Sequence, residues 1–534
     1  MVPCLCSVTL SSTTMSNIIS NQTYLSMLDK NCTNMKDLKK VHTQFIKTGL
    51  AKDPFAASRI LAFCTSPAGD INYAYLVFTQ IHNPNLFIWN TIIRGFSQSS
   101  NPQNAIYLFV NMLLNSPIQP QRLTYPSVFK AYAQLDLAQE GAQVHGRVIK
   151  MGLENDPFIR NTILYMYANC GFLNEAKKLF DRAIMNFDVV GWNIMIMGFA
   201  KCGLIEESKR LFDKMPLKNI VSWNSMISGY VRKGRFIDAL KVFHEMQKSR
   251  IKPNEFTMVS LLNACGCLGA IRQGEWIHDY MVKNKFEMNS IVITAIIDMY
   301  SKCGSIEKAL QVFKSAPKKG LSCWNSIILG LAMNGLEKEA IQLFSKLESS
   351  NLKPDNVSFI GVLTACNYSG LVDKARDYFL LMKERYKIKP SMKHYSSIVD
   401  VLGRAGCIEE AEELIRRMPM DPDTIIWGSL LWSCCKYGNK DVAKRAAKRL
   451  IELDPSESSG FVLMANVYAA SSNIEEAIKQ RLSLKEMQIE KETGCSSIEV
   501  NGEVHEFVAG GRKHPKAKAI YHILTGCSGS DICI

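Results

Sequence analysis

IVSWNSMISGYVRKGRFIDALKVFHEMQKSRIKPN, residues 220–254, contains two apolar patterns with helical spacing. The first recurs at three- and four-residue steps, which predicts one apolar helix face: Trp223, Met226, Ile227 and Tyr230. After Gly234, which permits a tight turn, a second apolar face follows: Ala239, Phe243 and Met246. Pro253 closes the stretch, which is therefore predicted to be a pair of helices joined by a turn.

Close copies of this stretch recur along the chain. The Trp223 line WNSMISGY is repeated as WNTIIRGF, WNIMIMGF and WNSIILGL at Trp89, Trp192 and Trp324, and as WGSLLWSC at Trp427, where Gly replaces Asn. The lines KVHTQFIKTGL, QVHGRVIKMGL and WIHDYMVKNKF place His42, His145 and His278 at one position of a longer composite. The composite spans about 102 residues and divides into units of about 35, 35 and 31 residues.

Neither helix of a unit can bury its apolar face alone, but stacked neighbours can. The chain is therefore predicted to be an all-α solenoid with one superhelical concave surface, in which the repeated Trp and Met residues pack the core.

Composition narrows the class of partner. The 534 residues include 63 Lys or Arg and 49 Asp or Glu, a net charge of +14 that favours a polyanion. The sequence contains no apolar run long enough for a membrane span, so no membrane partner is expected. The 17 cysteines are scattered, and several recur with the repeats, which favours reduced thiols in an intracellular protein.

The first 28 residues contain no charged side chain, and residues 7–20 are rich in Ser and Thr. This composition predicts an organelle transit peptide over residues 1–22. The absence of Arg favours a plastid over a mitochondrion, and a secretory signal fits poorly because the start is not basic. A terminus without any targeting role is the alternative.

The quoted unit, together with GRAGCIEEAEELIRRMP and GCSSIEVNGEVHEFVAGG, resembles the pentatricopeptide repeats of the plant PLS class, E/E+ subgroup, over residues 23–525. The resemblance implies a right-handed superhelix, with a repeat array over 23–423, E1 and E2 motifs over 424–491, which resemble tetratricopeptide repeats, and an E+-like segment with a tail over 492–534. Members of this class bind organelle RNA, most often to direct C-to-U editing.

In that family the fifth and last residues of a repeat meet about one nucleotide. The resemblance assigns base recognition to the pairs Asn90/Gln121, Asn161/Asp188, Asn193/Asn219, Asn224/Asn254, Thr294/Gly320, Asn325/Asp355 and Ser396/Asp423. The family code makes Asn/Asp favour U, Asn/Asn favour pyrimidines and Ser/Asp favour G, while Gln121 and Gly320 leave their bases open. Units with apolar fifth residues are expected to recognise bases weakly or not at all: Pro126/Asp156, Val259/Asn289 and Ile360/Ser391. A helix N-cap is the alternative role for any one of the Asn residues.

Two further series accompany these pairs. The second residue of a unit is apolar, which suits packing against base faces, at Phe87, Phe158, Val190, Val221 and Ile291, whereas Ser322 breaks the pattern. Position thirteen is basic, which predicts contacts with the RNA backbone, at Lys201, Arg232, Lys302 and Arg404. Solvated cations at helix ends are the alternative for the second series.

The carboxy-terminal part predicts a β-hairpin but no catalytic site. Ile498, Val500, Val504 and Phe507 flank Asn501-Gly502, a signal for a type I′ turn. Cytidine deamination needs a zinc site with the signature H-x-E and C-x-x-C, and neither pattern occurs in the sequence. No cofactor, metal or catalytic residue is therefore predicted, and the chain lacks the deaminase-like DYW domain of the longer family members.

The sequence thus predicts a non-enzymatic factor that binds single-stranded organelle RNA. A deaminase-bearing DYW-type protein, or another editing factor, is expected to act in trans. One alternative is a splicing, processing or stability factor without an editing role. A protein scaffold is the alternative from a different class, and salt-sensitive binding to single-stranded RNA would count against it.

Overall fold

The computed structural model describes residues 32–182, 187–455, 458–470, 473–486, 495–500, 503–508 and 516–527. The predicted transit peptide, residues 1–22, lies outside the described residues, as do residues 23–31 at the start of the predicted repeat array. The chain divides into two compact units, and the division falls between Gly229 and Tyr230, inside one helix.

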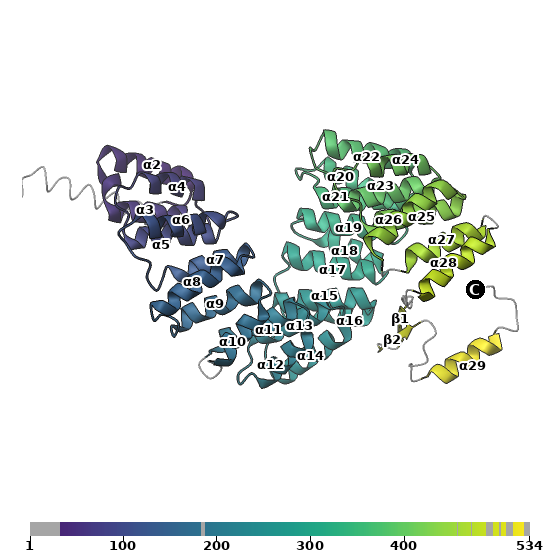
Figure 1. Ribbon diagram of the computed structural model, residues 1–534, viewed down its shortest axis with the longest axis horizontal. Coiled ribbons are helices and arrows are strands. Elements are labelled where there is room, and N and C mark those ends of the chain that lie inside the picture. Colours follow the sequence, from purple (N-terminus) through teal and green to yellow (C-terminus); the bar gives the residue numbers. More distant parts are fainter. Residues whose placement is uncertain are drawn as a thin grey trace, which may run out of the picture. The chain divides into compact units, whose positions relative to one another are not determined.

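The first unit consists of helical hairpins that follow one another along the chain (Figure 1). Its elements are α2 (Met35–Lys47), the 3₁₀ turn η1 (Leu50–Lys52), α3 (Pro54–Cys64), α4 (Ile71–Thr79), α5 (Leu86–Ser97), α6 (Gln103–Asn115), α7 (Tyr125–Gln134), α8 (Ala138–Lys150), α9 (Pro157–Asn169), α10 (Leu173–Arg182), α11 (Val189–Lys201), α12 (Ile205–Lys214) and most of α13 (Ile220–Arg232).

The second compact unit continues the alternation of first and second helices as far as α28, after which come two strands and one more helix. Its helices are α14 (Phe236–Lys248), α15 (Glu255–Leu268), α16 (Ile271–Lys283), α17 (Ser290–Lys302), α18 (Ile306–Ser315), α19 (Leu321–Met333), α20 (Glu337–Glu348), α21 (Asn356–Ser369), α22 (Val372–Glu384), α23 (Met392–Arg404), α24 (Ile408–Arg416), α25 (Thr424–Tyr437), α26 (Lys440–Leu453), α27 (Ser459–Ala470), α28 (Ile474–Glu486) and α29 (Ala517–Cys527). The predicted α-solenoid of helical hairpins is confirmed.

Local sequence explains where each hairpin begins and turns. At α11, the side chain of Asp188 accepts hydrogen bonds from the backbone N–H groups of Val190 and Gly191, which satisfies two donors of the first turn. The chain then turns at Gly203, whose φ of +81° is a left-handed conformation that glycine adopts without a Cβ clash. The same plan of cap, helix, glycine turn and second helix recurs at α13, α15 and α17, whereas α19 begins at Gly320 without a side-chain cap.

The repeated tryptophans pack against phenylalanines, as the prediction of core packing requires. In four units, the Trp of the first helix meets a Phe of the preceding second helix edge to face, with ring centroids 4.8–5.0 Å apart. The pairs are Phe78–Trp89, Phe180–Trp192, Phe212–Trp223 and Phe313–Trp324. Trp89, Trp192 and Trp223 are only 4–7% exposed.

The repeated histidines also share one environment. Nδ1 of His145 lies 3.2 Å from the hydroxyl oxygen of Tyr167, and Nδ1 of His278 lies 3.1 Å from that of Tyr300, in each case on the next first helix. His42 makes the same contact, at 2.8 Å, with Tyr73. His42 lies on α2 and Tyr73 on α4, so one helix intervenes, whereas the other two histidines contact a tyrosine on the very next helix. The histidine–tyrosine contact is therefore the same although the tyrosine comes from a different helix of the repeat. Burial lowers the pKa of all three histidines.

A small hairpin follows α28. Strands β1 (Cys495–Val500) and β2 (Glu503–Val508) pair antiparallel, with Val500 opposite Glu503 and Ile498 opposite His505. The predicted hairpin is confirmed, while the Asn501-Gly502 turn itself lies outside the described residues. Among the helices described, none has the length and apolarity needed to cross a membrane.

Candidate nucleic-acid interface

Three of the predicted pairs of fifth and last residues are joined by a hydrogen bond. In the first of the two compact units of the chain, Nδ2 of Asn161 donates to Oδ1 of Asp188 at 3.1 Å. Nδ2 of Asn193 donates to Oδ1 of Asn219 at 3.2 Å. In the second unit, Nδ2 of Asn325 donates to Oδ1 of Asp355 at 3.0 Å. Side chains about 30 residues apart in sequence are thus brought together at one register of consecutive first helices.

The last residue of each of these pairs is also a helix N-cap. Oδ1 of Asp188 accepts from two backbone N–H groups of α11, and Oδ1 of Asp355 accepts from the backbone N–H and hydroxyl of Ser358 on α21. The capping role therefore holds for the last residues, whereas the fifth residues lie inside their helices. In the described structure all hydrogen bonds to Asp188 and Asp355 end on Oδ1, so Oδ2 of each carboxylate has no protein partner.

Two of the fifth residues carry an unsatisfied oxygen. Oδ1 of Asn161 and Oδ1 of Asn193 are buried and have no hydrogen-bond partner in the described part of the chain. In contrast, Oδ1 of Asn325 accepts from the hydroxyl of Ser358 at 2.6 Å. A buried acceptor without a donor costs about 1–3 kcal/mol, so a donor from a ligand would be favourable at the first two positions.

Among the described contacts, three other predicted pairs are not linked in this way: Asn90/Gln121, Thr294/Gly320 and Ser396/Asp423. Oδ1 of Asn90 accepts from the hydroxyl of Thr124 at 2.7 Å rather than from Gln121. Thr294 donates to the backbone oxygen of Ser290, and Gly320 has no side chain to pair with it. Ser396 is half-buried, and Asp423 caps α25. In the pair Asn224/Asn254, Asn224 is 7% exposed and Asn254 caps α15.

In the units with apolar fifth residues, the last residues are engaged elsewhere. Asp156 forms an ion pair with Arg122, and Asn289 donates to Glu255 at 2.8 Å. The hydroxyl of Ser391 lies 2.7 Å from Nδ1 of His394. Pro126 is buried, and Val259 and Ile360 are half-buried. That such units contribute little to base recognition stays a prediction.

The second residue of a repeat is apolar and exposed in most of the described repeats. Phe87, Phe158, Val190 and Val221 in the first unit, and Ile291 in the second, are 48–69% exposed. The same repeat position holds five more exposed apolar residues among the described residues, which sequence reasoning missed: Phe55, Leu123, Phe256, Val357 and Ile425. Ser322 and Lys393 interrupt the series and are exposed polar residues.

The four predicted backbone-binding cations differ in their partners. Nζ of Lys201 donates to the backbone and side-chain oxygens of Asn169 at 2.9 and 3.0 Å. Lys302 pairs with Asp298 at 2.7 Å, and Arg404 pairs with Asp400 at 2.9 Å. Burial lowers the pKa of Lys302, but Asp298 outweighs that effect and the net shift is upward. Arg232 is exposed, and its side chain has no ion pair or hydrogen bond among the described residues.

The described residues contain no cluster of three or more His, Cys, Asp or Glu side chains that would hold a metal ion. The adjacent cysteines of α25 are held as thiols, because burial raises the pKa of Cys434 to about 12 and that of Cys435 to about 11. A protonated thiol is a poor ligand, since metals bind the thiolate.

Comparison with known proteins identifies the family to which these repeats belong. The PPR repeat profile matches residues 87–116, 158–186, 190–220, 291–321, 322–352 and 393–421, and the profile of the PPR repeat family matches residues 218–267. A pentatricopeptide repeat-containing chloroplastic protein of Arabidopsis thaliana is 61% identical over 510 residues, which cover 95% of this chain and 91% of that protein. The chain belongs to the pentatricopeptide repeat family.

Other similarities refine this membership. The E motif profile matches residues 437–499 of this pentatricopeptide repeat protein, which fits the E subgroup of the PLS class. A mitochondrial pentatricopeptide repeat-containing protein of Arabidopsis thaliana is 36% identical over 604 residues, covering 94% of this chain and 88% of the relative. The crystal structure of the pentatricopeptide repeat protein PPR10 from maize aligns with a TM-score of 0.54 at 20% identity, covering 88% of this chain and 74% of that chain, and supports the fold alone.

Proposed function

We propose that this pentatricopeptide repeat protein binds single-stranded RNA of a plant organelle and selects a site for C-to-U editing. The single observation that carries the proposal is the set of hydrogen-bonded pairs Asn161–Asp188, Asn193–Asn219 and Asn325–Asp355. Polar pairs at one register of stacked hairpins suit the recognition of successive unstacked bases, because such bases expose their Watson–Crick edges.

The free carboxylate oxygens of the two Asn–Asp pairs have the right chemistry for uracil. Oδ2 of Asp355 is an acceptor, and N3–H of uracil is a donor, so the two can form a charge-assisted hydrogen bond. The exposed second residues, such as Phe158 and Ile291, offer apolar surface against which a base can stack. On the family code we assign U to Asn161/Asp188 and Asn325/Asp355, pyrimidines to Asn193/Asn219 and Asn224/Asn254, and G to Ser396/Asp423.

Catalysis is assigned to another protein. We infer that residues 424–534 recruit a deaminase-bearing partner in trans, which the E motif match over residues 437–499 supports. Purified alone, the protein is expected to bind RNA and leave cytidine unchanged, with or without added zinc. Deamination by the purified protein would contradict this assignment.

A plastid is the proposed compartment, supported by the composition of residues 1–22 and by the chloroplastic relative at 61% identity. A fusion of residues 1–60 to a fluorescent protein is expected to enter plastids. Accumulation in mitochondria would contradict the choice of organelle.

The function is tested by sequencing organelle RNA from a null mutant. One or a few cytidines are expected to lose editing and to regain it when the wild-type protein is restored. Unchanged editing at all sites, together with altered transcript ends or retained introns, would overturn the editing role in favour of splicing, processing or stability.

A further inference from the structure

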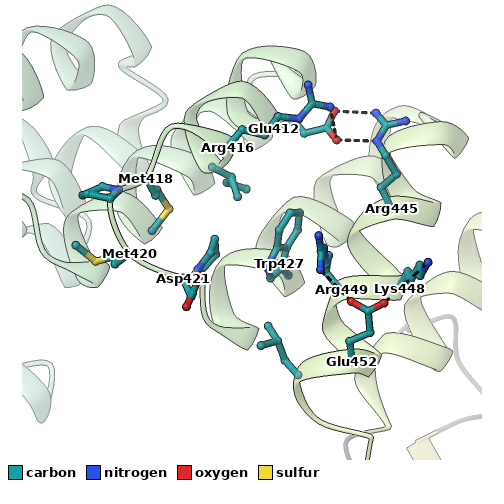
Figure 2. Close-up of a pocket in the computed structure, with 14 residues that line it drawn as sticks. Glu412, Arg416, Met418, Met420, Asp421, Trp427, Arg445, Lys448, Arg449 and Glu452 are labelled. Atoms are coloured by element: carbon teal, nitrogen blue, oxygen red, sulfur yellow. Dashed lines mark hydrogen bonds and ion pairs between the residues drawn. The ribbon is translucent and has the colours of Figure 1, made fainter.

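A cavity of about 950 Å³ lies where the last PPR repeat meets the E motif helices. Its walls are α24, the segment 418–422, the start of α25 and the basic face of α26. Figure 2 shows Trp427 between two sides: Met418, Met420 and Asp421 on one, and Arg449 and Lys448 on the other.

An aromatic contact that recurs at the matching junctions has no counterpart at this cavity. At the α18–α19 junction, Phe313 covers the ring of Trp324 with centroids 4.9 Å apart. Met418-Pro419 aligns with Met215-Pro216, and on that alignment Ile415 occupies the place of the phenylalanine. Isoleucine is smaller than phenylalanine and has no ring to meet the indole edge to face. One side of Trp427 therefore lines a cavity.

Cations outnumber carboxylates along the α26 wall. The nearly buried carboxylate of Glu412 accepts two hydrogen bonds from Arg445, both at 2.7 Å, and pairs with Arg416 at 3.1 Å. Hydrogen bonds and charge from these arginines hold the pKa of Glu412 below its usual value.

Glu452, the carboxylate that α26 contributes to the cavity, also pairs with two cations. Glu452 pairs with Arg449 at 3.1 Å and with Lys448 at 4.0 Å. Glu412 and Glu452 thus each pair with two cations, and the third carboxylate of the lining, Asp421, is exposed. The lining therefore holds four cations against three carboxylates, and α26 as a whole has five Lys or Arg residues against two acidic ones. Lys448 and Arg449 are 79% and 64% exposed, so their charge is available to a ligand.

We propose that this cavity docks an acidic segment of a partner protein that carries one large apolar side chain. The apolar side chain would pack on Trp427 between Met418 and Met420, and the segment's carboxylates would lie against Lys448 and Arg449. Net positive charge around an apolar floor matches this chemistry. The proposal deepens the proposed function, since it rests on recruitment of a partner by the E motif helices.

The position of Trp427 favours a protein over RNA as the occupant. It is the fourth residue of its first helix, and at about 100° per residue it lies about 160° around the helix from the second position, where Ile425 is exposed. The fifth residue of this unit is Gly428, which has no side chain to recognise a base. Trp427 therefore lines the cavity from the side of α25 opposite Ile425, which belongs to the series of second residues to which we assign base stacking.

The test uses the full-length protein and two fluorescein-labelled peptides, one of glutamates around a single phenylalanine and one of lysines around the same phenylalanine. Fluorescence anisotropy is expected to show saturable binding of the acidic peptide only. Ile415→Phe, which restores the residue found at the matching junctions, and Arg449→Glu should each weaken that binding at least tenfold. Lys444→Glu, a charge reversal on α26 outside the cavity lining, should change it less than twofold.

Three results would overturn the proposal: no saturable binding of the acidic peptide, equal binding of the lysine peptide, or Ile415→Phe binding like the wild type while remaining folded by circular dichroism. A single-stranded RNA oligonucleotide is titrated in parallel. If Arg449→Glu weakens RNA binding much more than Lys444→Glu does, the cavity serves RNA instead. If the wild type binds the acidic peptide but no RNA, the proposed RNA function fails and the docking site stands.

Discussion

The α18–α19 junction and the α24–α25 junction are both built from the same repeat, but their tryptophans and fifth residues have different surroundings. In the first, Phe313 covers Trp324 and the fifth residue, Asn325, is hydrogen-bonded to Asp355. In the second, Ile415 leaves one side of Trp427 on a cavity, and the fifth position is Gly428. One kind of hairpin therefore carries a polar recognition pair in one place and a basic, apolar-floored cavity in another. The contrast between the two junctions depends on a few residues, chiefly Ile415 in place of Phe313 and Gly428 in place of Asn325.

The largest expected effect concerns the packing of the two tryptophans. Trp324→Ala should lower the free energy of unfolding by about 3 kcal/mol, because it removes a ring packed against Phe313. Trp427→Ala should cost about half as much, since one side of its ring already lines a cavity. Urea denaturation followed by circular dichroism measures both, and equal losses would show that the two junctions are packed alike.

Most of the first junction could be predicted from sequence, and the second could not. Three- and four-residue spacing identified the helices, and the recurrence of Trp-Asn fixed the register that brings Asn325 to Asp355. Trp427 belongs to the same series, so sequence reasoning assigned it to the core. The signal that sets it apart is the isoleucine at 415, because the spacing from this position to the tryptophan is the same as between Phe180 and Trp192. The effect of the isoleucine depends on side-chain volume, which a periodic pattern does not contain.

Partners across neighbouring units were also beyond a reading of the sequence. Position thirteen identified Lys201 as a cation at a helix end, but its bonds to Asn169 join residues 32 apart. The contact between His42 and Tyr73 shows the same limit, because the matching histidines contact a tyrosine one helix earlier in the chain. Such contacts depend on how hairpins stack rather than on the pattern within one of them.

The next prediction compares cations of the repeats with a cation of α26 by their effect on the salt dependence of RNA binding. Gln at Lys201, Arg232, Lys302 and Arg404 together should weaken RNA binding and reduce the slope of log K against log salt by up to about 3, at about 0.7 per single-strand contact. Arg232→Gln should give the largest single change, because the other three already have partners in the protein. Lys444→Gln on α26 is the control, and a slope that survives the fourfold change would assign these cations to solvated helix ends.

A smaller effect concerns the histidine–tyrosine contacts, which all lie before residue 424. Burial lowers the pKa of His145 and His278, so the folded state keeps them neutral while the unfolded state takes up protons below about pH 6.5. Stability should therefore fall as pH drops from about 6.5 towards the lower folded-state pKa, by a few degrees in Tm. Changing both residues to Gln should reduce that dependence between pH 7 and 5. An unaltered pH profile would mean that other groups cause it.

The central claim is that each pair of fifth and last residues chooses a base, and the pair Asn325–Asp355 tests it most directly. The measurement is the affinity of the full-length protein for four RNAs that differ only at the nucleotide aligned with this unit. The wild type should prefer U, and Asn325→Thr combined with Asp355→Asn should move the preference towards A, by about tenfold in relative affinity, with overall stability little changed. An unchanged preference for U in the folded double variant would contradict the claim.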